Sequence, residues 1–149
     1  MGYNPKRATV QTITYLIRAA FDYGGASASA VELIQGPAGK YGRVRQAHIY
    51  NVTETFVGTT SGGQVLVGDG TDTNAYFDSG VTVLASASPA VAAAKNVPDT
   101  VASIEIPADQ AITVTLVECV GGTITGVADT SITIDWYDST GYAGKSVAA

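Results

Sequence analysis

The chain has 149 residues, of which 46% are hydrophobic and only 14% are charged. This length suits one domain with its own core, and the hydrophobic share excludes a disordered chain. The net charge is −5, and the basic residues form no run longer than two, which excludes a phosphate-tracking nucleic-acid binder.

Charge is divided unevenly along the chain. Residues 1–50 carry six of the eight Lys and Arg residues and a net charge of +4, whereas residues 51–149 carry a net charge of −9. A surface of two signs suits contacts between proteins, because a basic patch on one copy can face an acidic patch on its neighbour. We therefore expect the basic N-terminal third to meet acidic surface on a neighbouring copy or another protein.

Cysteine usage excludes a protein stabilised by internal disulfides, and hydropathy excludes one that crosses a membrane with a helix. The single cysteine, Cys119, cannot form an internal disulfide or an all-cysteine metal site, and we expect it to be buried in a strand over residues 112–120. No segment approaches the roughly 20 apolar residues that a membrane helix needs, and the N-terminus has no secretory apolar region. We expect no membrane partner.

The dominant hydrophobic period is two, which predicts β-strands. The first predicted strand covers residues 9–18, where Ile13, Tyr15 and Ile17 share one face. Two further segments alternate as clearly, and they predict strands at residues 112–120 and 131–137. The second of these strands places Trp136 in the core. Weaker alternation predicts strands at residues 30–34, 44–52, 64–67, 81–84 and 101–106.

Turn residues separate these strands throughout the chain. Glycine pairs and Gly-Asp turns punctuate the sequence, and the only helical candidate is residues 88–96, SPAVAAAKN, which could equally be a loop. The predicted fold is therefore all-β. It is a single jelly-roll or β-sandwich domain of about eight short antiparallel strands with little helix.

Candidate catalytic groups are few. His48 is the only histidine and lies within a predicted strand, with no serine in a strained elbow beside which it could act as a base. One histidine and one distant cysteine do not supply a zinc site. We predict no enzyme activity, no catalytic residue and no cofactor, although carboxylates from separate strands could still meet in a pocket.

One loop has the composition of a cation site. In residues 68–74, GDGTDTN, the side chains of Asp69, Asp72 and Asn74 could offer oxygens to Ca²⁺. The spacing does not match that of a calcium-binding loop with its distal glutamate. An ordinary hydrogen-bonded turn is the preferred interpretation, and no metal site is predicted.

Two segments resemble a known family. Residues 42–83, GRVRQAHIYNVTETFVGTTSGGQVLVGDGTDTNAYFDSGVTV, and residues 126–138, GVADTSITIDWYD, are similar to strands of the jelly-roll head decoration proteins, or capsid cement proteins, of tailed bacteriophages. The resemblance implies a non-enzymatic virion protein that is made in the host cytoplasm and binds the outer surface of the capsid. Its implied partners are the major capsid protein, whose lattice it stabilises, and its own copies in a trimer or other small cyclic oligomer.

The resemblance also implies an N-terminal arm that reaches the shell, so that residues 1–7 form the arm and residues 8–149 the β domain. The arm would supply the partner-binding residues, which are Gly2, Tyr3, Asn4, Pro5, Lys6 and Arg7.

Two other functions stay open. One is a carbohydrate-binding jelly-roll module of a phage fibre or secreted lectin, in which Tyr23, Tyr41, Tyr76 or Tyr142 would contact sugar. The other is a structural subunit of a phage tail or baseplate.

Overall fold

The computed structural model describes residues 10–24, 30–57, 63–79, 95–97, 104–121 and 124–138, and these contain eight strands and no helix. Within these ranges, accordingly, no helix is long and apolar enough to cross a membrane. The strands are β1 (Gln11–Asp22), β2 (Ala30–Ile34), β3 (Tyr41–Val57), β4 (Gln64–Gly68), β5 (Phe77–Asp78), β6 (Lys95–Val97), β7 (Ile112–Val117) and β8 (Thr125–Tyr137).

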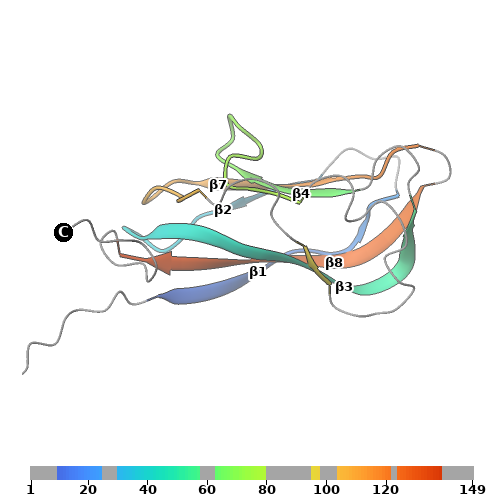
Figure 1. Ribbon diagram of the computed structural model, residues 1–149, viewed down its shortest axis with the longest axis horizontal. Helices are drawn as coiled ribbons and strands as arrows, with labels where there is room; N and C mark the ends of the chain where they lie inside the picture. The colour runs from blue at the N-terminus through green and yellow to red at the C-terminus, as the bar shows by residue number, and fades with distance from the viewer. Residues whose placement is uncertain are drawn as a thin grey trace, which may run out of the picture.

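The strands form two four-stranded sheets that pack face to face (Figure 1). One sheet has the order β1-β8-β3-β6 and the other β2-β7-β4-β5, and every pair is antiparallel. Apart from β4 and β5, consecutive strands lie in opposite sheets. The first and last strands, β1 and β8, are neighbours in one sheet. This is the strand order of an eight-stranded jelly roll, and it confirms the predicted fold class.

The core lies between the sheets and is centred on large side chains from β8 and its neighbours. Trp136 is only 2% exposed, as its phase with Ile132 and Ile134 predicts. Its ring fits against two glycines, because a Cβ at Gly36 or Gly42 would lie 2.3 or 2.6 Å from ring atoms. The indole N–H donates a hydrogen bond of 2.9 Å to the Tyr15 hydroxyl, which satisfies its only polar group.

Strand β8 pairs with β1 and β3 along its two edges, and its residues are buried on both faces over most of its length. Ile132 and Ile134 face the second sheet, while Ser131, Thr133 and Asp135 point to the outer face and are still at most 7% exposed. Thr12 and Thr14 of β1 form side-chain hydrogen bonds with Asp135 and Thr133, and Arg45 of β3 lies near Asp135. The middle of this sheet's outer face therefore contains polar side chains of β8 that are almost inaccessible to solvent.

Some predicted boundaries were wrong. Strand β3 runs to Val57 and β8 begins at Thr125, well beyond the predicted segments, whereas β7 ends at Val117 and leaves Cys119 buried after the strand. In residues 104–106 the only β-pairing is a single bridge from Ile106 to Gly42.

Two strands were not predicted. The short strand β5 was missed, and β6 includes Lys95 and Asn96, where a helix or loop was expected. The predicted strand at residues 81–84 and the rest of the helical candidate lie outside the described residues.

Candidate functional site

The outer face of the β1-β8-β3 sheet carries polar side chains around a shallow hollow. We call this surface the polar face and define it by the residues that line the hollow. The hollow has a volume of about 390 Å³ and is lined by Thr14, Gln46, His48, Tyr50, Ser131 and Thr133.

Strand register brings these residues together. Thr14 of β1 lies opposite Thr133 of β8, and Gln46 of β3 lies opposite the same threonine on the other side. His48 lies opposite Ser131 in the adjacent row. Residues from both ends of the chain and from its first third therefore meet on one face, because β8 runs between β1 and β3.

Hydrogen bonds within β3 and between β1 and β8 hold the polar face in place. The hydroxyls of Thr14 and Thr133 are 2.9 Å apart, and the Gln46 amide nitrogen lies 3.4 Å from His48 Nδ1. Beside the hollow, the Thr12 hydroxyl donates a 2.6 Å hydrogen bond to Asp135. Side chains ordered in this way lose little conformational entropy when a partner binds.

The chemistry of the hollow favours binding. His48 and Ser131 face one another, but no hydrogen bond joins them and none of the residues lining the hollow is a carboxylate that could orient the imidazole. The His48 and Tyr50 rings meet edge to face at 6.0 Å. Nowhere in the described ranges do three His, Cys, Asp or Glu residues form a group that could hold a metal ion.

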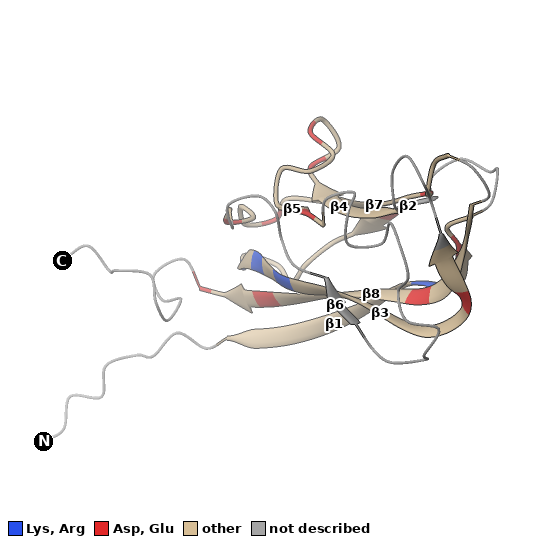
Figure 2. Ribbon diagram, turned by 45° about the vertical axis from the view of Figure 1, so that its right-hand side comes forward, with Lys and Arg blue, Asp and Glu red and all other residues tan. Residues whose placement is uncertain are grey.

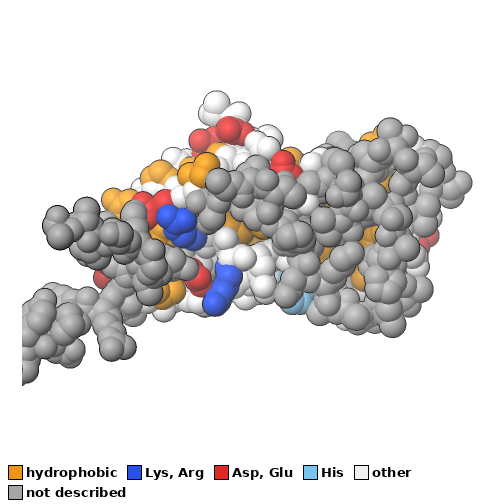
Figure 3. Space-filling model, in the orientation of Figure 1, with side chains coloured by type: hydrophobic (Ala, Val, Ile, Leu, Met, Phe, Trp, Pro, Cys, Tyr) orange, Lys and Arg blue, Asp and Glu red, His pale blue; other side chains and the backbone are white. Residues whose placement is uncertain are grey.

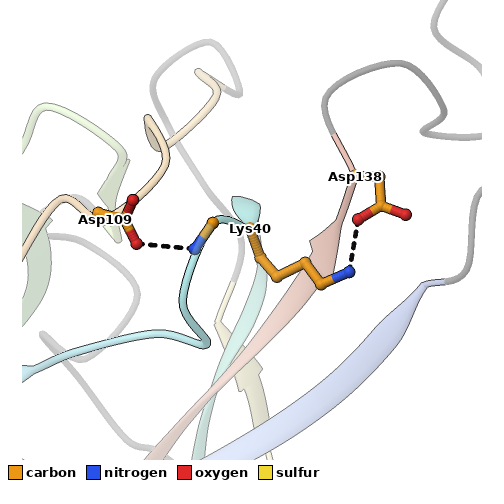
Figure 4. A network of polar contacts seen from close by, with 4 residues as sticks. Lys40, Asp109 and Asp138 are labelled. Atoms are coloured by element: carbon orange, nitrogen blue, oxygen red, sulfur yellow. Dashed lines mark hydrogen bonds and ion pairs between the residues drawn. The ribbon is translucent and has the colours of Figure 1, made fainter.

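Charged residues gather at the end of the sheet where β3 begins and β8 ends (Figures 2 and 3). Lys40 forms an ion pair with Asp138, and the Asp109 carboxylate accepts a 2.7 Å hydrogen bond from the Gly39 backbone N–H (Figure 4). Arg45 lies 3.8 Å from Asp135.

A further ion pair crosses between the sheets. Arg18 of β1 lies 2.6 Å from Glu32 of β2. Basic residues of the N-terminal third are thus paired with acidic residues of the same chain. The charge that we expected to meet a neighbouring copy is in part neutralised within the chain.

Burial shifts the pKa of groups near this charged end and in the core. Burial, reinforced by a 2.7 Å hydrogen bond that its hydroxyl donates to Glu105, raises the pKa of Tyr137. Burial also raises the pKa of Tyr23, whose hydroxyl lies 2.6 Å from that of Thr130, and of the Cys119 thiol. All three groups are neutral at physiological pH, and the thiol is no candidate nucleophile.

The loop after β4 forms the ordinary turn that we preferred to a cation site. The Asp69 carboxylate accepts hydrogen bonds from the backbone N–H groups of Thr71 and Asp72, at 2.9 and 2.8 Å, and these bonds lower its pKa. The Asn74 amide donates a 2.9 Å hydrogen bond to Asp78. One oxygen of Asp69, Oδ1, therefore accepts both hydrogen bonds of the turn.

The structure describes only some of the residues that we predicted to contact a partner or a sugar. Gly2, Tyr3, Asn4, Pro5, Lys6 and Arg7 lie outside the described residues, as does Tyr142. Of the other tyrosines considered for sugar binding, Tyr23 is fully buried and Tyr76 is 6% exposed, so neither presents its ring to a ligand, whereas Tyr41 is half-buried. Sequence reasoning missed Tyr50, because only the register of β3 against β8 shows that it borders the hollow.

Comparison with known proteins adds little. No protein-family model matches the chain, and no curated protein matches it. Among solved structures, a chain described as "Cyanophage Pam1 capsid asymmetric unit" aligns over 93% of this chain and 90% of its own length, with a TM-score of 0.39 and 12% identity. A likeness this distant carries no conclusion about function.

Proposed function

We propose that this protein is a capsid decoration protein, which binds the outer surface of a phage head, reinforces the lattice of the major capsid protein and catalyses no reaction. The polar face is the observation that carries the binding role. The link to a capsid comes from the resemblance of residues 42–83 and 126–138 to head decoration proteins. The jelly-roll fold is compatible with it but serves many functions.

The polar face suits a broad contact with another protein surface. Three of its six side chains, those of Thr14, Ser131 and Thr133, are short hydroxyls, and none of the six is Lys, Arg, Asp or Glu. The hydrogen bond between Thr14 and Thr133 orders two of these hydroxyls before any partner binds. A partner that fills the hollow displaces water with little loss of entropy from these hydroxyls and without desolvating a Lys, Arg, Asp or Glu that lines it. On a capsid, modest affinity at each contact is multiplied when several copies of the protein are linked in an oligomer.

The test is attachment to phage heads that lack this protein, measured by co-sedimentation. His48→Glu places an unpaired charge in the hollow and should weaken attachment at least tenfold. Leu33→Glu is the matched control, since Leu33 is 72% exposed on the second sheet, and it should attach like the native chain. If both variants attach like the native chain, the polar face is not the binding surface.

A second variant tests the arm. Deleting residues 1–7 should leave the circular dichroism spectrum unchanged and weaken attachment, because Lys6 and Arg7 would no longer reach acidic surface on the shell. Undiminished attachment would remove the arm from the proposal. If neither the native chain nor any variant attaches to heads, electron microscopy of native particles would show whether the protein belongs to the tail or baseplate.

Carbohydrate binding is the second candidate, and the hollow favours it. Hydroxyls, an amide and an imidazole beside the Tyr50 ring form a polar surface of the kind that binds sugars. A glycan array separates the two functions, because a decoration protein should bind no glycan on it. Binding that Tyr50→Ala abolishes would favour the sugar-binding module.

A further inference from the structure

We propose that β1 pairs through residues 11–17 with the same segment of a second copy of this chain, in antiparallel fashion across a two-fold axis at Thr14. The two β1 strands would join the β1-β8-β3-β6 sheets of two copies into one continuous sheet. This contact holds whether or not the proposed role on a capsid is right.

The first observation is the length of the free edge. The sheets end at four strands, of which β2, β5 and β6 have five, two and three residues, whereas β1 has twelve. Short edge strands are one way in which proteins prevent unwanted pairing. Strand β1 pairs with β8 on one side, and no described strand pairs with its other side.

The second observation is that the first part of this edge lacks protection. Residues 11–17, QTITYLI, contain no charge and no proline, both of which block edge pairing. The register against β8 first shifts between Leu16 and Arg18, so that Ile17 lies in the irregularity, and Arg18 is the first charged residue. A second irregularity before Phe21 includes Ala20 at φ +48°. The unprotected segment therefore consists of the regular residues 11–16 followed by Ile17.

The third observation is incomplete burial on the core side of this segment. Ile13 and Tyr15 point toward the second sheet and pack on the core, yet both are only half-buried. On the outer face, Leu16 is 58% exposed. A strand placed against β1 would cover these apolar side chains, which the single copy leaves partly in water.

The segment is complementary to itself in one register. With Thr14 on the axis, Ile13 lies opposite Tyr15 of the second copy, and Thr12 lies opposite Leu16. Aromatic side chains opposite β-branched ones are favourable cross-strand pairs. The first charged residue, Arg18, lies opposite Val10, so like charges do not meet. Because positions of equal parity face one another, core-facing residues stay on the core side in both copies.

A two-fold contact joins copies in pairs. It predicts an even number of copies in solution, which differs from the trimer implied by the family resemblance. The mass of the native chain by light scattering at increasing concentration should rise to twice that of one copy. A monomer at every concentration, or a trimer, would overturn the proposal.

Charge substitutions at the axis test the register. Thr14→Lys and Thr14→Glu should each be monomeric, because two like charges would meet directly, and mixing the two variants should restore the pair. Restoration also shows that both variants fold. Leu33→Lys, on the exposed face of β2, is the matched control and should associate like the native chain. If Thr14→Lys associates like the native chain, the contact is elsewhere.

A disulfide provides an independent readout. Directly opposed residues of an antiparallel pair have Cα atoms about 4.5–5.5 Å apart, which is within the range that a disulfide spans. Thr14→Cys should therefore oxidise to a covalent pair, whereas Leu33→Cys should not. The native Cys119 is 1% exposed and does not compete. Failure of Thr14→Cys to cross-link under oxidising conditions would overturn the register.

Discussion

Replacing Trp136 with alanine tests the central packing of the sandwich. The side chain is 2% exposed and lies against Gly36 and Gly42, so almost all of its surface leaves water on folding. A tryptophan buries about 150–250 Å², and at about 25 cal/mol per Å² this corresponds to roughly 4–6 kcal/mol as an upper bound. Removing a large buried aromatic costs about 3–5 kcal/mol, and we expect the free energy of unfolding to fall by that amount.

Urea unfolding followed by circular dichroism measures the loss. The melting temperature should also fall, by about 2–4 °C for each kcal/mol in a domain of this size. Tyr15→Phe is the comparison, because it removes only the acceptor of the indole N–H and should cost about 1 kcal/mol. Trp136 is the only tryptophan, so native fluorescence reports its surroundings directly. A water-exposed emission maximum in the native protein, or a loss below about 1 kcal/mol for the alanine variant, would refute this packing.

Three other outcomes follow from the structure. Gly42→Ala should lower the free energy of unfolding by about 1–3 kcal/mol in urea titration, because the new methyl group would lie 2.6 Å from the Trp136 ring; an unchanged midpoint would show that the ring can move aside. The lowered pKa of Asp69 stabilises the fold above the ordinary carboxyl pKa, and this contribution disappears as pH falls through the lowered value. Melting curves between neutral and acid pH should therefore show native protein and Asp69→Asn converging at low pH, and a constant gap would contradict this. Burial raises the pKa of the Cys119 thiol, so a thiol reagent should label it only after unfolding, and rapid labelling of the folded protein would show that the site opens.

The fold class could be predicted because alternation is a local property that the sequence displays directly. Ile132, Ile134 and Trp136 share one face in any strand, so their burial follows once a second sheet exists. The ends of strands were less predictable. Strand β3 continues to Val57 only because β8 pairs with it through several register shifts. Strand β5 has two residues that pair with β4, and no period can be read from two residues.

The polar face could not be predicted for a related reason. Thr14, His48 and Ser131 are far apart in sequence, and nothing in their local segments marks them as neighbours. Polar residues on the outer positions of strands read as ordinary solvent-facing side chains. The burial of Ser131 and Thr133 depends on β8 lying between β1 and β3, which is a consequence of jelly-roll topology.

That topology also explains why the polar face and the free edge of β1 belong to one surface. Thr14 lies on β1, so it borders the hollow on one side and the unpaired edge on the other. Pairing two copies through β1 would bring their two hollows onto the same face of one continuous sheet, related by the two-fold axis. A partner that repeats its surface, as a capsid lattice does, could then engage both hollows at once. Since the second engagement is intramolecular, avidity would exceed the affinity of either hollow alone by a factor of about 10²–10⁴ where the spacing matches.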